Sequence, residues 1–237
     1  MNTAEIKNSG YIVKDDLITG TDLESLQVFT RNSIEEFKGR NFRLYDKDFE
    51  NSIISSPAFN NKIDSFIQNI IKNEYPEFSN KSSDIYKVLR VVAGVKQKEQ
   101  ANLFHFDAHL ITILIPIIIP DNANNKNGDL VILPNIRRVH KYLILNIIQK
   151  IFFQNKIVRK ILSKFSLKYF LDYKILKLKV GNIYAFNGFT TLHGNMEIDE
   201  GSVRATLLVH AYDIFKNSSI IKNNRKRSIM KEVKNIQ

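Results

Sequence analysis

Five apolar runs between residues 86 and 213 place the strongest constraint on how this chain can fold. Each run is short, rich in residues that favour strands, and bounded by Gly, Asn, Asp or Pro. The runs are YKVLRVVAG, FHFDAHLITILIPIII, GDLVILP, KILKLKVGNIYAF and VRATLLVHAYD. Because no helix alternates regularly with these strands, an antiparallel sandwich or barrel is favoured over a parallel α/β sheet.

The residues before this region, 1–85, predict helices that support the β-rich part. GYIVKDDL, at residues 10–17, is typical of a short strand. Thr21 and Glu24 have the spacing of a capping box, which satisfies the first amide groups of a helix. We therefore expect a helix from this point to about Phe37.

A second N-terminal helix is predicted from its start signal. Ser56 is a suitable N-cap, and Pro57 suits the first helical position because its missing N–H is not needed there. Apolar residues then recur at helical spacing to about Asn73. We expect residues 40–56 to be irregular and residues 75–84 to form a loop.

A basic segment interrupts the strands. From residue 137 to residue 170 the chain carries nine Lys or Arg and no acid. Ile147, Ile151 and further apolar residues recur at helical spacing, with Lys150 and other lysines mostly opposite, which predicts an amphipathic helical insertion. Three interpretations stay open: a helical cover on the β fold, a flap formed by residues 142–170 that contacts an anionic membrane surface or substrate, or a segment that binds nucleic acid.

The composition limits the partners and the chemistry. The chain has no cysteine, so a transition metal must be held by imidazole and carboxylate. The net charge of +11 favours anionic partners, although no stacking pattern or known motif supports nucleic acid. The start, MNTAEIKNSG, does not resemble a signal peptide, and LITILIPIIIP is too short to span a bilayer. We expect a cytoplasmic protein. Peripheral contact with the inner face of the membrane is compatible with this location.

The run FHFDAHL raises the possibility of a metal site. His105, Asp107 and His109 occupy every second position, so on a strand they would share one face. With 5 histidines and 24 acids in the chain, one such pair can arise by chance. A metal site therefore needs another ligand, and His193 lies at the entry of a later predicted strand.

The order His-x-Asp, distal His, then Arg-x-Thr resembles that of the Fe(II)/2-oxoglutarate-dependent dioxygenases, which include phytanoyl-CoA and prolyl hydroxylases. The resemblance covers roughly residues 86–213. It implies a mainly β fold with some helix, a double-stranded β-helix of the jelly-roll or cupin kind. It also implies that His105, Asp107 and His193 ligate iron and leave positions open for other ligands.

The resemblance extends to the cosubstrate. Arg204 matches the arginine that binds the distal carboxylate of 2-oxoglutarate, a role that suits a planar, permanently charged donor. Thr206 matches the hydroxyl position two residues later. NGDLVILPN, at residues 127–135, resembles the Gly-containing stretch that opens a middle strand of that fold.

The function implied by the resemblance is hydroxylation of a C–H bond, coupled to decarboxylation of 2-oxoglutarate to succinate. Fe(II), 2-oxoglutarate and O2 are the implied cofactors, with ascorbate as a further candidate. Asp107 stands where halogenating relatives carry a small residue, which favours hydroxylation. The basic charge favours an anionic substrate, such as an acidic or lipid-linked sugar. A peptide, a free metabolite, or a non-catalytic nucleic-acid-binding or scaffold role are the alternatives.

We expect a single oxygenase domain over residues 1–237. Its expected parts are listed in chain order: helical support at 1–85, a β-helix core at 86–213 with an insertion at 137–175, and a basic tail at 214–237.

Four other residues have more than one interpretation. His109 is either a substrate contact or a packed core histidine, and His210 is expected to be packed. His140 is expected in a solvated basic cluster with Arg137 and its neighbours. Arg90, on the first β-rich run, could reach a substrate, but an ion pair at the strand end is favoured.

Overall fold

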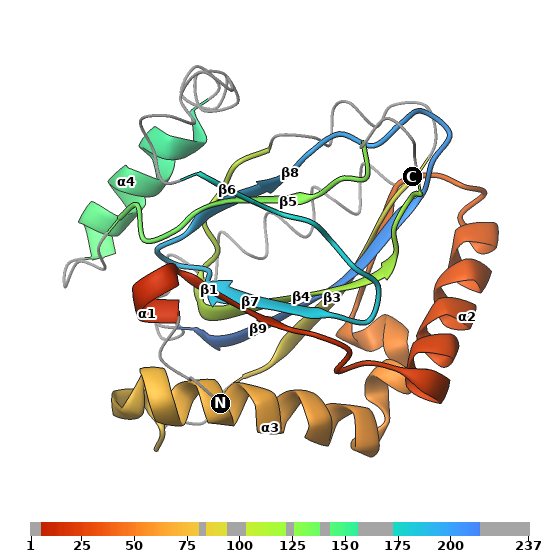
Figure 1. Ribbon diagram of the computed structural model, residues 1–237, viewed down its shortest axis with the longest axis horizontal. Helices are drawn as coiled ribbons and strands as arrows, with labels where there is room; N and C mark the ends of the chain where they lie inside the picture. Colours follow the sequence, from red (N-terminus) through yellow and green to blue (C-terminus); the bar gives the residue numbers. More distant parts are fainter. Residues whose placement is uncertain are drawn as a thin grey trace.

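Two antiparallel sheets face one another and form the body of the protein (Figure 1). This computed structural model describes residues 6–80, 84–93, 103–121, 126–137, 143–155 and 173–213. The large sheet has the strand order β1-β7-β4-β9-β3-β2, and the small sheet has the order β6-β5-β8. Every strand pair is antiparallel, as the sequence predicts for its β-rich half.

The elements have the following bounds. The strands of the large sheet are β1 Tyr11–Lys14, β2 Phe42–Tyr45, β3 Tyr86–Val92, β4 His109–Ile118, β7 Ile183–Asn187 and β9 Arg204–Asp213. Those of the small sheet are β5 Leu130–Leu133, β6 Lys174–Leu176 and β8 Leu192–Asn195. The α-helices are α1 Ile6–Ser9, α2 Gly20–Glu36, α3 Pro57–Glu74 and α4 Leu143–Gln154. Short 3-10 helices are η1 Asp46–Phe49, η2 Ile53–Ser55 and η3 Pro76–Phe78.

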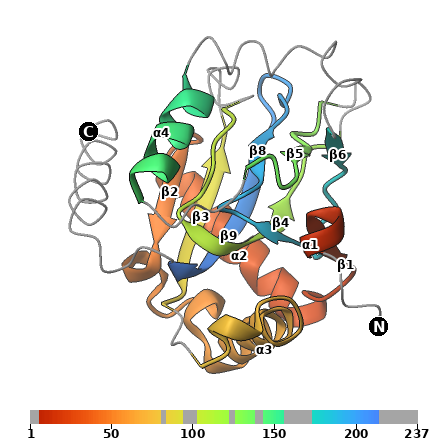
Figure 2. The same cartoon turned by 90° about the vertical axis from the view of Figure 1, so that its left-hand side faces the viewer.

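Helices α2 and α3 bury the outer face of the large sheet. Alternate residues of β4, including Ile113 and Ile115, pack in one apolar cluster with Leu26 of α2 and with Ile63 and Ile67 of α3. Each of these side chains is fully buried, and burying such a side chain stabilises the fold by about 1.5–3 kcal/mol. In Figure 1 α3 lies below the large sheet and the small sheet lies above it, and Figure 2 again shows α3 at the bottom of the molecule.

The other face of the large sheet points toward the small sheet. Leu114 and Phe186, from the large sheet, share an apolar cluster with Leu130 and Ile132 of β5. This alternation along each strand leaves one row of inward-facing positions on β3, β4 and β9. Residues with polar side chains on these rows are therefore held between the sheets.

The outer face of the small sheet carries a third cluster, onto which α4 packs. Val131 and Leu133 alternate with the inward residues of β5 and group with Phe104, Phe106 and Leu192. Phe153 of α4 packs against this cluster. Figure 1 places α4 at the opposite end of the molecule from α2.

Several sequence predictions hold and others are wrong. The second helix is confirmed: α3 begins at Pro57, and the Ser56 hydroxyl accepts a hydrogen bond from the Phe59 N–H at 3.3 Å. The predicted capping box at Thr21 is wrong, because α2 already begins at Gly20. Thr19 is the N-cap of α2 and makes no side-chain capping hydrogen bond, and the Ile18 N–H just before it donates to the Gly181 carbonyl at 3.0 Å.

Two boundaries also differ from the predictions. Residues 40–56 are not irregular throughout, because β2 pairs with β3 and buries Phe42 and Leu44. The run at 174–186 is not one strand but two, one in each sheet. Of the predicted flap, α4 is helical, while residues 156–170 and the predicted basic tail at 214–237 lie outside the described residues.

Candidate metal centre

His105 and His193 are brought together by the backbone. His105 lies in the extended stretch before β4, and His193 lies on β8. The two residues form an isolated β-bridge, with N–H to carbonyl distances of 2.9 Å and 3.1 Å. Their rings lie with centroids 4.4 Å apart. Residues 88 positions apart in the chain therefore present two imidazoles to one place.

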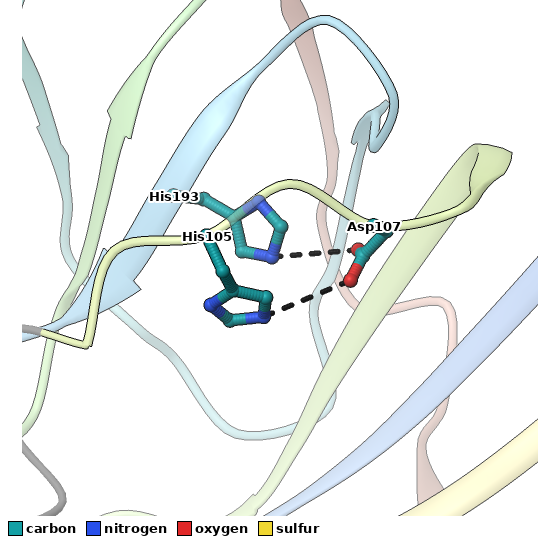
Figure 3. A group of neighbouring side chains, drawn as sticks. All are labelled: His105, Asp107 and His193. Atoms are coloured by element: carbon teal, nitrogen blue, oxygen red, sulfur yellow. Dashed lines mark ion pairs between the residues drawn. The ribbon is translucent and has the colours of Figure 1, made fainter. Parts of the chain in front are cut away.

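Asp107 completes a group of three ligand atoms (Figure 3). The Nε2 atom of His193 lies 3.4 Å from Asp107 Oδ2, and the Nε2 atom of His105 lies 3.7 Å from Asp107 Oδ1. The ligand atoms of the three residues all lie within 4.8 Å of one another. Ligands at about 2.1 Å from one metal ion lie roughly 3 Å apart, so a small inward shift would place a metal between them.

The hydrogen bonds of the imidazoles select the tautomer that binds a metal. His105 Nδ1 lies 2.8 Å from the Leu103 carbonyl oxygen, and His193 Nδ1 lies 3.1 Å from that of Thr191. A carbonyl can only accept, so each Nδ1 donates its hydrogen and each Nε2 presents a lone pair toward Asp107. Partial desolvation of the His105 ring, and then the nearby His193 imidazole, lower the pKa of His105 to about 3. His105 is therefore neutral at pH 7, as a metal ligand must be.

The Asp107 carboxylate is held from two sides. The Thr112 hydroxyl donates to Asp107 Oδ2 at 2.6 Å, and the Asp107 N–H donates to the Gly188 carbonyl at 2.9 Å. His210 Nδ1 lies 3.7 Å from Oδ2 and 3.2 Å from the Thr112 hydroxyl oxygen. Burial by itself would raise the pKa of Asp107, but three neighbouring imidazoles and this hydroxyl lower it below its ordinary value. The carboxylate is therefore ionised and oriented.

Gly188 leaves the space that this carboxylate needs. A Cβ atom at position 188 would lie 2.3 Å from the Thr112 hydroxyl oxygen and 2.9 Å from Asp107 Cβ. Both distances are far shorter than ordinary contacts. Any larger residue would displace Asp107 or the threonine that orients it.

Arg204 lies on the inward face of the neighbouring strand β9. It is 2% exposed, and its Nη1 donates to the Gly128 carbonyl at 2.7 Å. Among the described residues its buried Nε has no hydrogen-bond partner. Burial and then the nearby Arg90 guanidinium lower the pKa of Arg204 to about 9, which leaves it cationic at neutral pH.

An anion would satisfy this arginine. A buried N–H without a partner costs about 1–3 kcal/mol, and a carboxylate is the usual acceptor for such a donor. Gly128 has φ +74°, and a Cβ there would lie 2.9 Å from Arg204 Nη1. The glycine therefore makes room for the guanidinium. Thr206 is buried at the next inward position, as the spacing predicts.

Other sequence candidates lie near the site with different contacts. His109 is buried and stacks on His210 with ring centroids 5.1 Å apart, so it is one ring removed from Asp107. His210 is packed as expected, but it also approaches Asp107. Arg90 pairs with Thr206 across β3 and β9, on the inward face, rather than lying at a strand end.

The predicted solvated cluster around His140 is wrong for Arg137. This side chain is 5% exposed and lies between two phenylalanine rings, which cover its guanidinium. The sequence suggested solvation because basic residues surround it, whereas the fold turns it inward. His140 lies outside the described residues.

Comparison with solved structures shows which proteins share this fold. The chain is similar to the non-heme α-ketoglutarate-dependent epimerase SnoN from nogalamycin biosynthesis, with a TM-score of 0.60 and 9% identity over 88% of this chain and 78% of that one. It is similar to EvdO2 from Micromonospora carbonacea var. aurantiaca, complexed with 2-oxoglutarate, with a TM-score of 0.58 and 12% identity over 88% of each chain. A Pseudomonas putida prolyl-4-hydroxylase gives a TM-score of 0.51 and 9% identity over 87% of this chain and 94% of that one.

These likenesses confirm the double-stranded β-helix predicted from the sequence. No family model matches the chain, and no curated protein matches it. At such low identity the shared property is the fold, so the chemistry must be argued from the residues of this chain.

Proposed function

We propose that this protein is a single-domain Fe(II)- and 2-oxoglutarate-dependent oxygenase. The observation that carries the proposal is the convergence of His105, Asp107 and His193, with both Nε2 lone pairs turned toward the carboxylate. Two imidazoles and one carboxylate on one side of a metal leave its other positions open, which suits non-heme Fe(II). Arg204, with its unpartnered Nε beside Gly128, is the matching site for the distal carboxylate of 2-oxoglutarate.

The residues of this chain would hold and orient the reactants. When bound, iron with 2-oxoglutarate and O2 supplies the oxidising chemistry, and ascorbate is a candidate for keeping the metal reduced. Thr112 fixes one oxygen of Asp107, so the carboxylate presents a defined edge to the metal. Arg204 fixes the far end of the cosubstrate, and Thr206 adds a hydroxyl on the same face. Phe186, from the apolar cluster between the sheets, packs on the His193 ring with centroids 4.7 Å apart.

Hydroxylation of a C–H bond is the reaction we propose. The structural neighbours include an epimerase, a carbocyclase and prolyl hydroxylases by their names, so the fold leaves the reaction type open. The carboxylate at position 107 supports hydroxylation over halogenation, because it fills the position that halide would need.

We propose an anionic substrate, such as an acidic or lipid-linked sugar. The net charge is +11, and Arg90 adds a second inward-facing guanidinium to the sheet that carries Arg204. Two cations on one inner face favour a site that receives more than one acidic group. A peptide or a neutral metabolite is the competing substrate class.

We also propose that α4 contacts an anionic membrane surface, as a peripheral protein would. Ile144, Ile148 and Phe152 recur at every fourth position and are 67%, 58% and 61% exposed. The surrounding segment is basic and free of acids, which suits an acidic leaflet. Within the described residues, no helix has the length and apolar character needed to cross a bilayer.

The metal assignment is tested with three alanine variants. Purified protein should bind one Fe(II) per chain without oxygen, and it should release succinate when given 2-oxoglutarate and air. His105→Ala, Asp107→Ala and His193→Ala should each lose both properties, because two ligands hold a labile ion poorly. Asp22→Ala serves as the control, since this carboxylate pairs with Lys62 and lies outside the triad.

The same experiment separates the other function classes. Full activity in the Asp107→Ala protein would refute the assignment of the ligands. Failure of the wild-type protein to bind Fe(II) or release succinate would favour a scaffold on the same fold. A salt-dependent gel shift with nucleic acid, in the absence of turnover, would favour the nucleic-acid alternative.

A further inference from the structure

Phe106 stands between the two ligand positions of the stretch before β4. Its neighbours His105 and Asp107 point toward His193, whereas Phe106 belongs to the cluster on the outer face of the small sheet. Phe106 is 1% exposed. The packing around its ring therefore holds the short stretch of backbone that carries both ligands.

Arg137 clamps this ring from one side. Its guanidinium carbon lies 4.0 Å from the centroid of the Phe106 ring and 4.2 Å from that of Phe189. Its Nε also donates to the Phe189 carbonyl at 2.6 Å. Phe189 follows Gly188, whose carbonyl accepts from the Asp107 N–H. The arginine thus joins the ligand-bearing stretch to the turn that supports Asp107.

Helix α4 holds the same ring from another direction. Phe153 meets Phe106 edge to face, with ring centroids 5.5 Å apart and an interplanar angle of 82°. The adjacent Phe152 is 61% exposed, and its ring meets the Phe153 ring edge to face with centroids 5.4 Å apart. One residue of the helix therefore packs on the ligand-bearing stretch while its neighbour faces outward.

We infer that Phe153, Phe106 and Arg137 form a stack that positions His105 and Asp107 for metal binding and links α4 to the metal centre. These are positioning residues, because they act on the ligands without reaching the metal. The inference rests on the proposed metal site. It goes further by giving the inserted helix α4 a role in setting the geometry of the site, beyond covering the sheet.

The link has a consequence for regulation. An aromatic contact of this kind depends on the angle between the rings, and side chains in a packed cluster transmit small displacements. Whatever displaces α4 should therefore loosen the metal centre, and an occupied metal centre should stabilise the docked helix by the same free energy.

The test compares paired substitutions by their affinity for Co(II), used as an air-stable probe of the iron site. Phe153→Ala should weaken Co(II) binding roughly ten-fold or more, in the range typical for residues that orient metal ligands. Phe153→Leu should restore most of the affinity by refilling the volume. Arg137→Lys should weaken binding as well, because lysine keeps the charge but loses the planar surface that stacks.

Two controls isolate the stack from general loss of packing. Ile148→Ala removes an exposed apolar side chain from the same helix and should leave the dissociation constant for Co(II) unchanged. Phe66→Ala removes a partly buried ring from the α3 side of the large sheet and should lower thermal stability without changing Co(II) affinity. The visible spectrum of bound Co(II), which reports ligand geometry, should change only in the stack variants.

The outcomes separate the inference from the proposed function. If wild-type protein does not bind Co(II) or Fe(II), the proposed function itself fails. If wild-type protein binds the metal, but Phe153→Ala and Ile148→Ala bind it equally well and with the same spectrum, the stack does not position the ligands. Equal loss of affinity in Phe66→Ala would also overturn the inference, since any loss of packing would then suffice.

Discussion

At the scale of single residues, Arg204 should set the affinity for 2-oxoglutarate. Arg204→Lys keeps a cation but loses the two-pronged donor geometry, so it should cost about 1.5–3 kcal/mol, or roughly 10- to 150-fold in the dissociation constant. Fe(II) binding should persist, because Arg204 is not among the three ligands. Calorimetric titration of 2-oxoglutarate into the anaerobic iron-loaded variant measures the change.

Arg90 provides the comparison for this variant. It lies on the same inward face, on the strand paired with β9. Arg90→Lys should leave 2-oxoglutarate binding near the wild-type value. If Arg204→Lys binds 2-oxoglutarate normally and Arg90→Lys does not, then Arg90 holds the carboxylate and the assignment of Arg204 is wrong.

The sequence predicts the residues that we propose to carry the chemistry, and it misses those that orient them. His105, Asp107, His193 and Arg204 have a recognisable order and spacing. The roles of Thr112 and of residues such as Arg137 arise only from strand pairing and turns, which join positions far apart in the chain. Thr112 meets His210 across 98 residues, and no local pattern records that contact.

At the scale of elements, periodicity predicts long elements better than short ones. α3 spans 18 residues, and the helix predicted from its apolar periodicity ends within one residue of the observed end. β2 has four residues, too few for alternation to be recognised, and only its pairing with β3 defines it. The run at 174–186 contributes one strand to each sheet. Its composition is similar throughout, so the sequence does not show where the chain passes from one sheet to the other.

The helix α4 carries a prediction of its own about membrane surfaces. Vesicles of anionic lipid should co-sediment with the protein at low salt, and vesicles of neutral lipid should not. Each basic residue near an acidic leaflet contributes about 1 kcal/mol. The attraction should weaken with added salt, because the Debye length falls from roughly 30 Å at 0.01 M to about 8 Å at 0.15 M.

Two variants test which part of the helical segment is responsible. A variant with four Lys→Glu substitutions should no longer co-sediment with anionic vesicles, because the substitutions reverse the charge of the segment. The four positions are Lys150, Lys156, Lys160 and Lys164. Phe152→Ala should weaken co-sedimentation with anionic vesicles, because it removes exposed apolar surface. Phe153→Ala should weaken co-sedimentation less, because Phe153 packs against the small sheet. Equal pelleting with both lipids, or none with either, would return the segment to the role of a helical cover.

At the scale of the whole molecule, the candidate metal centre joins the two sheets. His105 and Asp107 precede β4 of the large sheet, whereas His193 belongs to β8 of the small sheet. Among the described residues, the β-bridge between His105 and His193 links the two sheets at this point through the backbone. A metal bound by all three side chains would add a second link between the sheets.

Metal binding should therefore raise the thermal stability of the folded protein. A ligand at 100 times its dissociation constant stabilises the native state by about 2.7 kcal/mol, which raises the Tm of a chain of this size by roughly 5–10 °C. Anaerobic melting followed by circular dichroism, with and without Fe(II) or Co(II), measures this shift. His193→Ala should lose the shift because it retains ligands from the large-sheet side alone. Ca²⁺ should give none, since it prefers six to eight oxygen ligands. An equal shift in His193→Ala, or with Ca²⁺, would mean that the metal stabilises the chain elsewhere and does not link the two sheets.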